Sequence, residues 1–138
     1  MPLAVVVGAG SKWSAESGWQ QKQFGKGASA EDLPDDVKFG ISGGVCLKLS
    51  EAGYDLVIMS RTMANLIPLR DTISAKGYGA CTAVECDCTS PESIAAAFST
   101  LDVNAVDVLF YNTGLAPAFG KRATQDAEFA LPAVILLL

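Results

Sequence analysis

Glycines follow the first apolar run of this sequence in the spacing that a phosphate-binding turn requires. The run ends at Gly8, and Gly10 and Ser11 follow at once. Gly40 and Ile41 begin the next helical pattern. Glycines at such a turn let backbone N–H groups at a helix start approach a pyrophosphate, because no Cβ stands in the way. The pattern indicates a phosphate site, although glycines near a strand end can also serve close packing alone.

Alternating strands and helices must position these glycines. Apolar, β-branched runs predict buried strands over residues 3–8, 54–60, 80–86 and 106–111. Helices are expected over residues 40–53, 62–76 and 91–101, the last two capped by Thr62 and Ser90. This alternation predicts an α/β fold with a doubly wound parallel sheet of about four strands in the order 3-2-1-4.

The chain length of 138 residues suits a single domain. Residues 12–39 separate the first strand from its helix and are longer than such a connection usually is, so we interpret them as an insertion. They contain Trp13 and Trp19 and show no clear periodicity. Residues 115–138 form an atypical C-terminal tail. A lid-like insertion and a retained intron both explain the interruption.

Joined across the insertion, the glycines give the pattern Gly-x-x-x-Gly-Ile-x-Gly. This pattern resembles the glycine loop of the short-chain dehydrogenase/reductase family, whose usual form is Thr-Gly-x-x-x-Gly-Ile-Gly. Val7 replaces the threonine and Ser42 replaces a glycine. Asn112-Thr113-Gly114 is similar to the family's Asn-Asn-Ala-Gly after the fourth strand. The resemblance spans residues 3–114 and implies an incomplete Rossmann-like domain that binds a nicotinamide dinucleotide.

The resemblance also implies which residues would contact this cofactor. They are Gly8, Gly10, Ser11, Gly40, Ile41, Ser60, Arg61, Asp87, Cys88, Asn112 and Gly114. NAD-specific members carry an acidic residue at the end of the second strand, where this chain has Ser60-Arg61. A guanidinium can hold a 2′-phosphate with two hydrogen bonds, so we expect NADP(H) rather than NAD; a solvated arginine is the alternative. Asp87 would contact the adenine amino group beside the backbone of Cys88, or serve as a loop or helix-cap carboxylate.

Family members transfer a hydride between a carbonyl and an alcohol with a Tyr-x-x-x-Lys pair and a serine, in which the tyrosine is the general acid/base. No tyrosine of this chain is followed four positions later by lysine. The residues found there are Ile58, Thr82 and Leu115. We therefore expect no catalytic residue in this chain, and an isolated chain that is inactive as an oxidoreductase.

Composition excludes several other functions. The net charge is −5 without a basic run, so nucleic acid is not an expected partner. No apolar run is long enough to span a membrane, and we expect a cytoplasmic protein. The absence of histidine removes Ser-His-Asp hydrolysis and His-ligated metals. Zinc binding by Cys86 and Cys88 with Cys81 is conceivable, but without a second close pair we expect no metal site.

The fourth strand is expected to form an exposed apolar sheet edge, which favours pairing with another chain. A homo- or hetero-oligomer could form through this edge or through the last helix. The alternative function is therefore a non-catalytic interaction or regulatory module that pairs with a full-length relative. A truncated or mis-spliced product is a further alternative.

Overall fold

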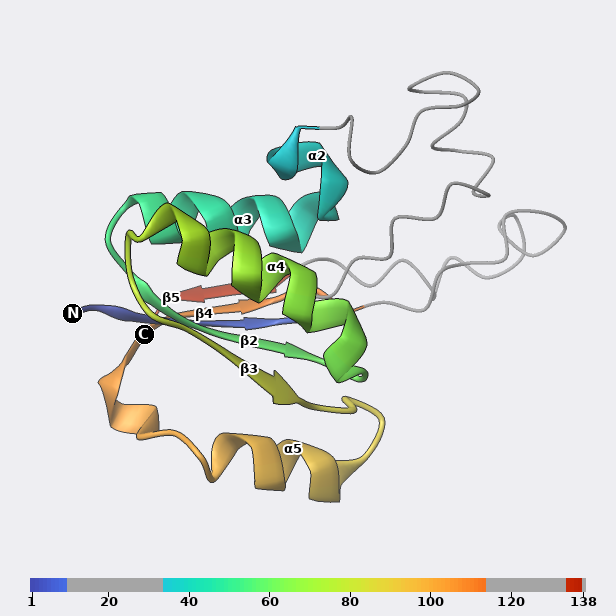
Figure 1. Cartoon of the computed structure of the whole chain (residues 1–138). Coiled ribbons are helices and arrows are strands. Elements are labelled where there is room, and N and C mark those ends of the chain that lie inside the picture. The colour runs from blue at the N-terminus through green and yellow to red at the C-terminus, as the bar shows by residue number, and fades with distance from the viewer. Residues whose placement is uncertain (10–33, 114–133, 138) are drawn as a thin grey trace, which may run out of the picture.

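The computed structural model describes residues 1–9, 34–113 and 134–137. Within these residues, five strands form one sheet in the order β3-β2-β1-β4-β5 (Figure 1). The strands are β1 (Leu3–Val7), β2 (Asp55–Ser60), β3 (Cys81–Glu85), β4 (Val106–Tyr111) and β5 (Val134–Leu137). Strands β1 to β4 are parallel to one another, which confirms the predicted order 3-2-1-4 and the Rossmann-like α/β class.

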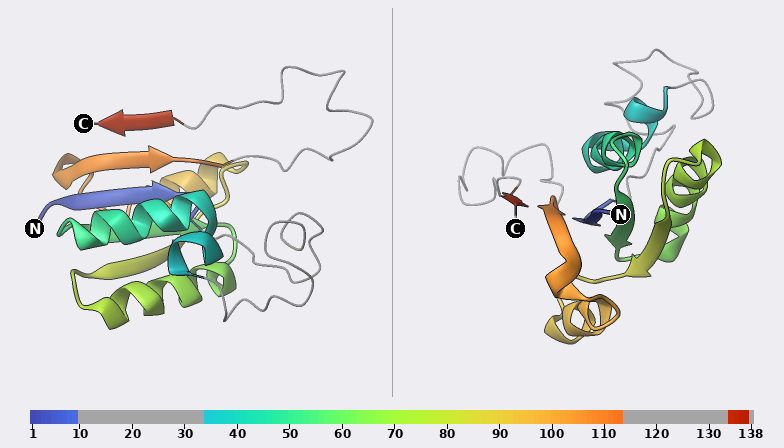
Figure 2. Two further views of the ribbon diagram at one scale, coloured as in Figure 1. Left: turned by 90° about the horizontal axis from the view of Figure 1, so that it is seen from above. Right: turned by 90° about the vertical axis from the view of Figure 1, so that its left-hand side faces the viewer.

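Helices lie on both faces of this sheet (Figure 2). The described helices are α2 (Asp35–Lys38), α3 (Gly40–Glu51), α4 (Met63–Lys76), α5 (Pro91–Phe98) and a short 3₁₀ helix (Val103–Ala105). Helices α3 and α4 pack on one face and α5 on the other. Helices α3, α4 and α5 each return the chain from one parallel strand to the start of the next.

The central strand β1 shows why the sheet needs both helix layers. Its side chains alternate between the two apolar clusters: Ala4 and Val6 pack beneath α3 and α4, and Val5 and Val7 pack on the α5 side. All four are at most 2% exposed. A continuous apolar run is therefore buried on both faces, as predicted for a parallel strand.

Strand β5 corrects the prediction that β4 ends the sheet as an exposed edge. Phe110 of β4 is in register with Ile135 of β5, and the two strands run antiparallel. The short apolar run near residue 138 belongs to the predicted tail, and it shows no pattern that would indicate this pairing. Pairing between β4 and β5 supplies the hydrogen bonds that an open edge would leave unmade.

Two further expectations need correction. Thr62 is the N-cap residue of α4, but its side chain accepts no capping hydrogen bond. Ser90 caps α5 as predicted, since its side chain accepts from the backbone N–H of Ser93. The proposed insertion includes the helix α2, which periodicity did not indicate. Residues 12–33 of the insertion, with Trp13 and Trp19, and most of the tail lie outside the described residues.

None of the described helices is both long and apolar enough to cross a membrane.

Candidate functional site

The carboxyl ends of the four parallel strands bring most of the predicted site residues to one edge of the sheet. Val7, the last residue of β1, is in register with Met59 of β2 and Tyr111 of β4. Ser60 of β2 is in register with Glu85 of β3. The residues that directly follow these strand ends are Gly8, Arg61, Cys86, Asp87 and Asn112. Ligands of open α/β sheets bind at this edge.

Gly8 makes the turn that leaves β1. Its φ is +89°, and the N–H groups of Gly8 and Ala9 both donate to the carbonyl oxygen of Met59, at 2.8 and 3.0 Å. A Cβ on Gly8 would lie 2.2 Å from the carbonyl oxygen of Asn112. Glycine is therefore required here by the closeness of two backbone segments, in addition to any approach of a ligand.

Asn112 connects this turn to the start of α3. Its backbone N–H donates to the carbonyl oxygen of Val7 at 3.0 Å. Its side-chain Nδ2 donates to Oγ of Ser42 at 3.0 Å, across 70 residues of sequence. Ser42 is buried, with 5% of its surface exposed. Asn112 thus joins β1 to α3, through a serine that was not among the predicted site residues.

Helix α3 begins without a side-chain cap. Its N-cap residue is Phe39, and no side chain accepts a capping hydrogen bond there. Gly40 has a φ of +70°, which lets the chain change direction between α2 and α3. A Cβ on Gly43 would lie 2.1 Å from Cβ of Phe39, so this glycine permits the close packing of that ring. Ile41 is 76% exposed beside them.

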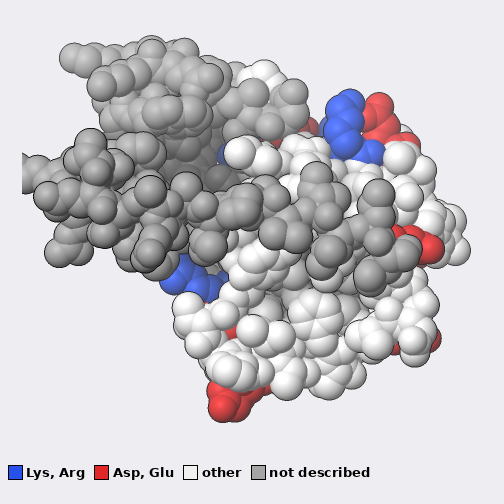
Figure 3. All heavy atoms as spheres, turned by 180° about the vertical axis from the view of Figure 1, so that it is seen from behind, with Lys and Arg blue, Asp and Glu red and all other residues white. Residues whose placement is uncertain are grey.

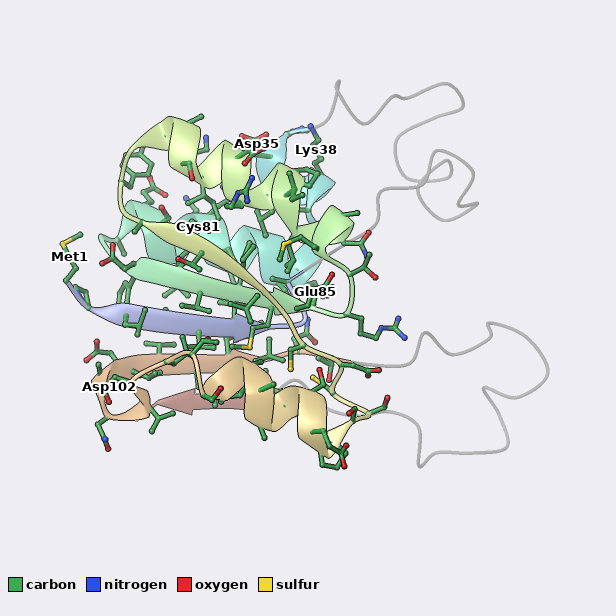
Figure 4. The ribbon with its side chains drawn as sticks, turned by 60° about the horizontal axis from the view of Figure 1, so that its bottom comes forward. Met1, Asp35, Lys38, Cys81, Glu85 and Asp102 are labelled. Carbon is green, nitrogen blue, oxygen red and sulfur yellow. The ribbon has the colours of Figure 1, made fainter. Side chains whose placement is uncertain are left out.

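Arg61 follows β2 and is exposed, as expected of a residue that reads a ligand phosphate. Ser60 is half-buried, and its carbonyl oxygen accepts from the N–H of Cys86 at 2.8 Å. A carboxylate from β3 accepts a hydrogen bond from the start of α4: Oε1 of Glu85 accepts from the backbone N–H of Met63 at 3.0 Å. Figure 4 labels Glu85 at the end of β3. Glu85 thus takes the capping role that the sequence assigned to Thr62.

The Asp87 carboxylate forms a local turn after β3. Its Oδ1 accepts from the backbone N–H of Thr89 at 2.9 Å and from the hydroxyl of Thr89 at 2.7 Å. These bonds lower the pKa of Asp87, and the charge of Arg61 lowers it further. Hydrogen bonds and a nearby cation both favour the ionised form. Asp87 is therefore an ionised acceptor, held in place by its own loop.

The two cysteines beside Asp87 differ in burial. Burial raises the pKa of Cys86 to about 11, while Cys88 is only half-buried. All four cysteines, Cys46, Cys81, Cys86 and Cys88, are unpaired. In the described part of the chain, no three His, Cys, Asp or Glu side chains are grouped closely enough to hold a metal ion.

Charged side chains are scattered over the molecule. Among the coloured residues of the face in Figure 3, Lys and Arg occur in separate small groups. Near the far end of α3, a hollow of about 350 Å³ is lined by charges of both signs. Its lining residues are Asp35, Leu47, Lys48, Glu51, Lys76 and Tyr78. This hollow contains none of the predicted site residues.

The structure therefore brings Gly8, Gly40, Arg61, Asp87 and Asn112 to one edge. Three predicted residues, Gly10, Ser11 and Gly114, lie outside the described residues. Sequence reasoning missed two contributors, Ser42 and Glu85. The replacement of a family glycine by Ser42 was the one available signal, whereas nothing local marks Glu85 as a helix cap.

Solved structures of similar fold are short-chain dehydrogenases. A short-chain dehydrogenase from Sphingobium yanoikuyae in complex with NADPH has a TM-score of 0.60 and 22% identity; the match covers 94% of this chain and 40% of that one. A metagenomic short-chain oxidoreductase in complex with NADP has a TM-score of 0.58 and 23% identity, with 83% and 39% covered. A bulky-bulky ketone specific alcohol dehydrogenase from Comamonas testosteroni gives 0.61 and 17%, with 94% and 40% covered.

This chain thus spans about 40% of the length of these structures. No curated protein matches the sequence. The model of the short chain dehydrogenase family matches residues 37–133, which is well over half of the chain. The strand order, the parallel sheet and this match together show that the chain belongs to the short-chain dehydrogenase family.

Proposed function

We propose that this chain is the NADP(H)-binding portion of a short-chain dehydrogenase/reductase-type oxidoreductase. One observation carries the proposal: the glycine turn after β1, the start of α3 and an exposed Arg61 lie at the same edge of a parallel sheet. The two structural neighbours described with NADPH and NADP support this choice of cofactor.

The residues of this edge fit the parts of a dinucleotide. The uncapped start of α3 suits the pyrophosphate, because its backbone N–H groups and the helix dipole favour an anion. Arg61 suits the 2′-phosphate, and Asp87, an ionised acceptor, suits the adenine amino group. We include Gly10, Ser11, Gly40, Ile41, Ser60, Cys88, Asn112 and Gly114 in the proposed cofactor site.

When bound, the nicotinamide would carry the hydride that the family's reaction transfers. This chain binds and orients the cofactor but supplies no Tyr-x-x-x-Lys pair to move the proton. A carbonyl reduction needs that proton as well as the hydride. We therefore propose that the isolated chain binds NADP(H) without turnover, and that a homo- or hetero-oligomer or additional sequence supplies the acid/base group.

Titration of the purified chain with NADPH and with NADH, followed by nicotinamide fluorescence, tests this function. We expect saturable binding of both cofactors, with NADPH preferred by roughly tenfold or more, because a charge-assisted contact to the 2′-phosphate contributes about 1.5–3 kcal/mol. Absence of NADPH binding to the folded chain would overturn the proposal.

Arg61→Ala tests the specificity, with Arg70→Ala as the matched control. Arg70 is partly exposed, but it lies in α4 and pairs with its neighbour Asp71 at 2.7 Å. We expect the Arg61 variant to lose most of its preference for NADPH over NADH and the Arg70 variant to retain it. An equal preference in both variants would show that Arg61 does not read the 2′-phosphate.

A further inference from the structure

Ser42 occupies an unusual position for a polar residue. It lies in the first turn of α3, only 5% exposed, and its Oγ accepts from Nδ2 of Asn112 at 3.0 Å. A buried hydroxyl is tolerated when it has a hydrogen-bond partner, and the partner of this one directly follows β4. The bond therefore joins the beginning of α3 to the end of β4.

Asn112 is fixed independently of Ser42. Its N–H donates to the carbonyl oxygen of Val7, and its own carbonyl oxygen faces Gly8 so closely that no Cβ would fit between them. These backbone contacts hold Asn112 in the sheet. The hydrogen bond consequently sets the position of α3 relative to the sheet rather than the position of Asn112.

The first turn of α3 needs a hydrogen bond of this kind to hold it in place. No side chain caps it, and its first residue, Gly40, takes a positive φ and, as a glycine, restricts the backbone of the helix start less than other residues would. The starts of α4 and α5 are held by side chains, Glu85 and Ser90 respectively. In α3 the equivalent constraint is the hydrogen bond between the side chains of Ser42 and Asn112. This bond does not use the backbone N–H groups of the first turn, which have no side-chain cap.

We propose that Ser42 is a positioning residue for the dinucleotide site: its hydrogen bond to Asn112 fixes the first turn of α3 and thereby orients the backbone N–H groups that bind the pyrophosphate. This role rests on the proposed NADP(H)-binding function. Ser42 itself does not contact the cofactor. The glycine that is usual at this position in the family has no side chain with which to form such a hydrogen bond.

Helix α3 also contains a matched control. Ser50 is 1% exposed, and its Oγ has no hydrogen-bond partner among the described residues. Ser42→Ala and Ser50→Ala therefore make the same change in the same helix at equal burial, with a partner lost only in the first. Alanine favours helix more than serine does, so both variants should fold.

The test compares two ligands on the full chain by isothermal titration calorimetry. NADPH contains the pyrophosphate, whereas adenosine 2′-monophosphate contains the adenine and 2′-phosphate without it. We expect Ser42→Ala to weaken NADPH binding roughly two- to tenfold, the value of one hydrogen bond, and to leave adenosine 2′-monophosphate binding unchanged. Ser50→Ala should change neither affinity.

Two results for Ser42→Ala would overturn the inference. Unchanged affinity for both ligands would show that the bond does not position the site, and equal weakening of both would show a general structural role. A wild-type chain that binds neither ligand would instead refute the proposed function itself. Thermal unfolding of each variant confirms that the protein remains folded during the comparison.

Discussion

The end of the sheet where α3 and α4 begin is held together differently from the end where they finish. At the first end, hydrogen bonds join a helix start to the end of a strand: Asn112 after β4 donates to Ser42 of α3, and Glu85 of β3 accepts from Met63 of α4. At the other end, Lys48 pairs with Glu51 three residues away on an exposed surface. The long-range hydrogen bonds at this end join strand segments instead: Oδ1 of Asp55 accepts from the N–H of Ala80, and Oδ2 of Asp107 accepts from the N–H of Leu3.

Glycines and serines show the same contrast. Gly8 and Gly53 both have a φ near +90°, but a Cβ would meet the Asn112 backbone at Gly8 and nothing within 4 Å at Gly53. Ser42 has a partner and Ser50 has none among the described residues. At the edge that we propose binds the cofactor, Gly8 and Ser42 thus both lie against the distant Asn112, and preorganisation of this kind benefits binding.

The largest predicted effect separates the two glycines. Gly8→Ala should destabilise the fold by roughly 3 kcal/mol or more, since the new Cβ meets backbone that cannot move without disturbing β1 and β4. Gly53→Ala should cost only about 1 kcal/mol, the strain of a positive φ. Chemical denaturation measures both values. Equal destabilisation would show that the contact with Asn112 does not matter.

A change of intermediate size concerns the carboxylate that caps α4. Glu85→Ala should lower the unfolding free energy by about 0.5–1 kcal/mol, because the N–H of Met63 loses its acceptor. Glu85→Gln keeps an acceptor and should recover part of this loss. Glu51→Ala at the far end should leave the melting temperature essentially unchanged, since an exposed ion pair contributes little. A larger loss of stability in Glu51→Ala than in Glu85→Ala would contradict the proposed difference between the two ends of the sheet.

The smallest predicted effect is electrostatic. The pKa values of Asp87 and Glu51 are both lowered, by hydrogen bonds from Thr89 and from Lys48 respectively. A lowered folded-state pKa stabilises the protein above the unfolded value, about 4, and this contribution is lost as the pH falls through the folded-state pKa. High salt screens the exposed Lys48 charge but not a neutral hydroxyl.

NMR titration of the carboxyl carbons with and without salt tests this difference. Salt should raise the pKa of Glu51 more than that of Asp87, and Thr89→Val should raise the pKa of Asp87 alone. Thr72→Val, which removes a hydroxyl bonded to the carbonyl oxygen of Pro68, is the control. A larger salt response at Asp87 would mean that charges rather than Thr89 hold its carboxylate.

Sequence patterns predicted the features of the fold that depend on residues close together in the chain. The buried strand at Leu3–Val7 and the Ser90 cap follow from local apolar and capping patterns, and the parallel order follows from their alternation. The contacts missed are long-range: Ser42 with Asn112, Met63 with Glu85, and β4 with β5. Each depends on how the sheet brings distant segments together, which no short window of sequence contains.

The central claim is that NADP(H) binds at the edge formed by the strand ends. Backbone amide shifts in a ¹⁵N-labelled chain titrated with NADP⁺ test it most directly. We predict the largest saturable shifts at Gly8, Ser42, Arg61, Asp87 and Asn112, with little change at Glu51 and Tyr78. Shifts centred on the far end of α3, or none in a folded chain, would contradict the account.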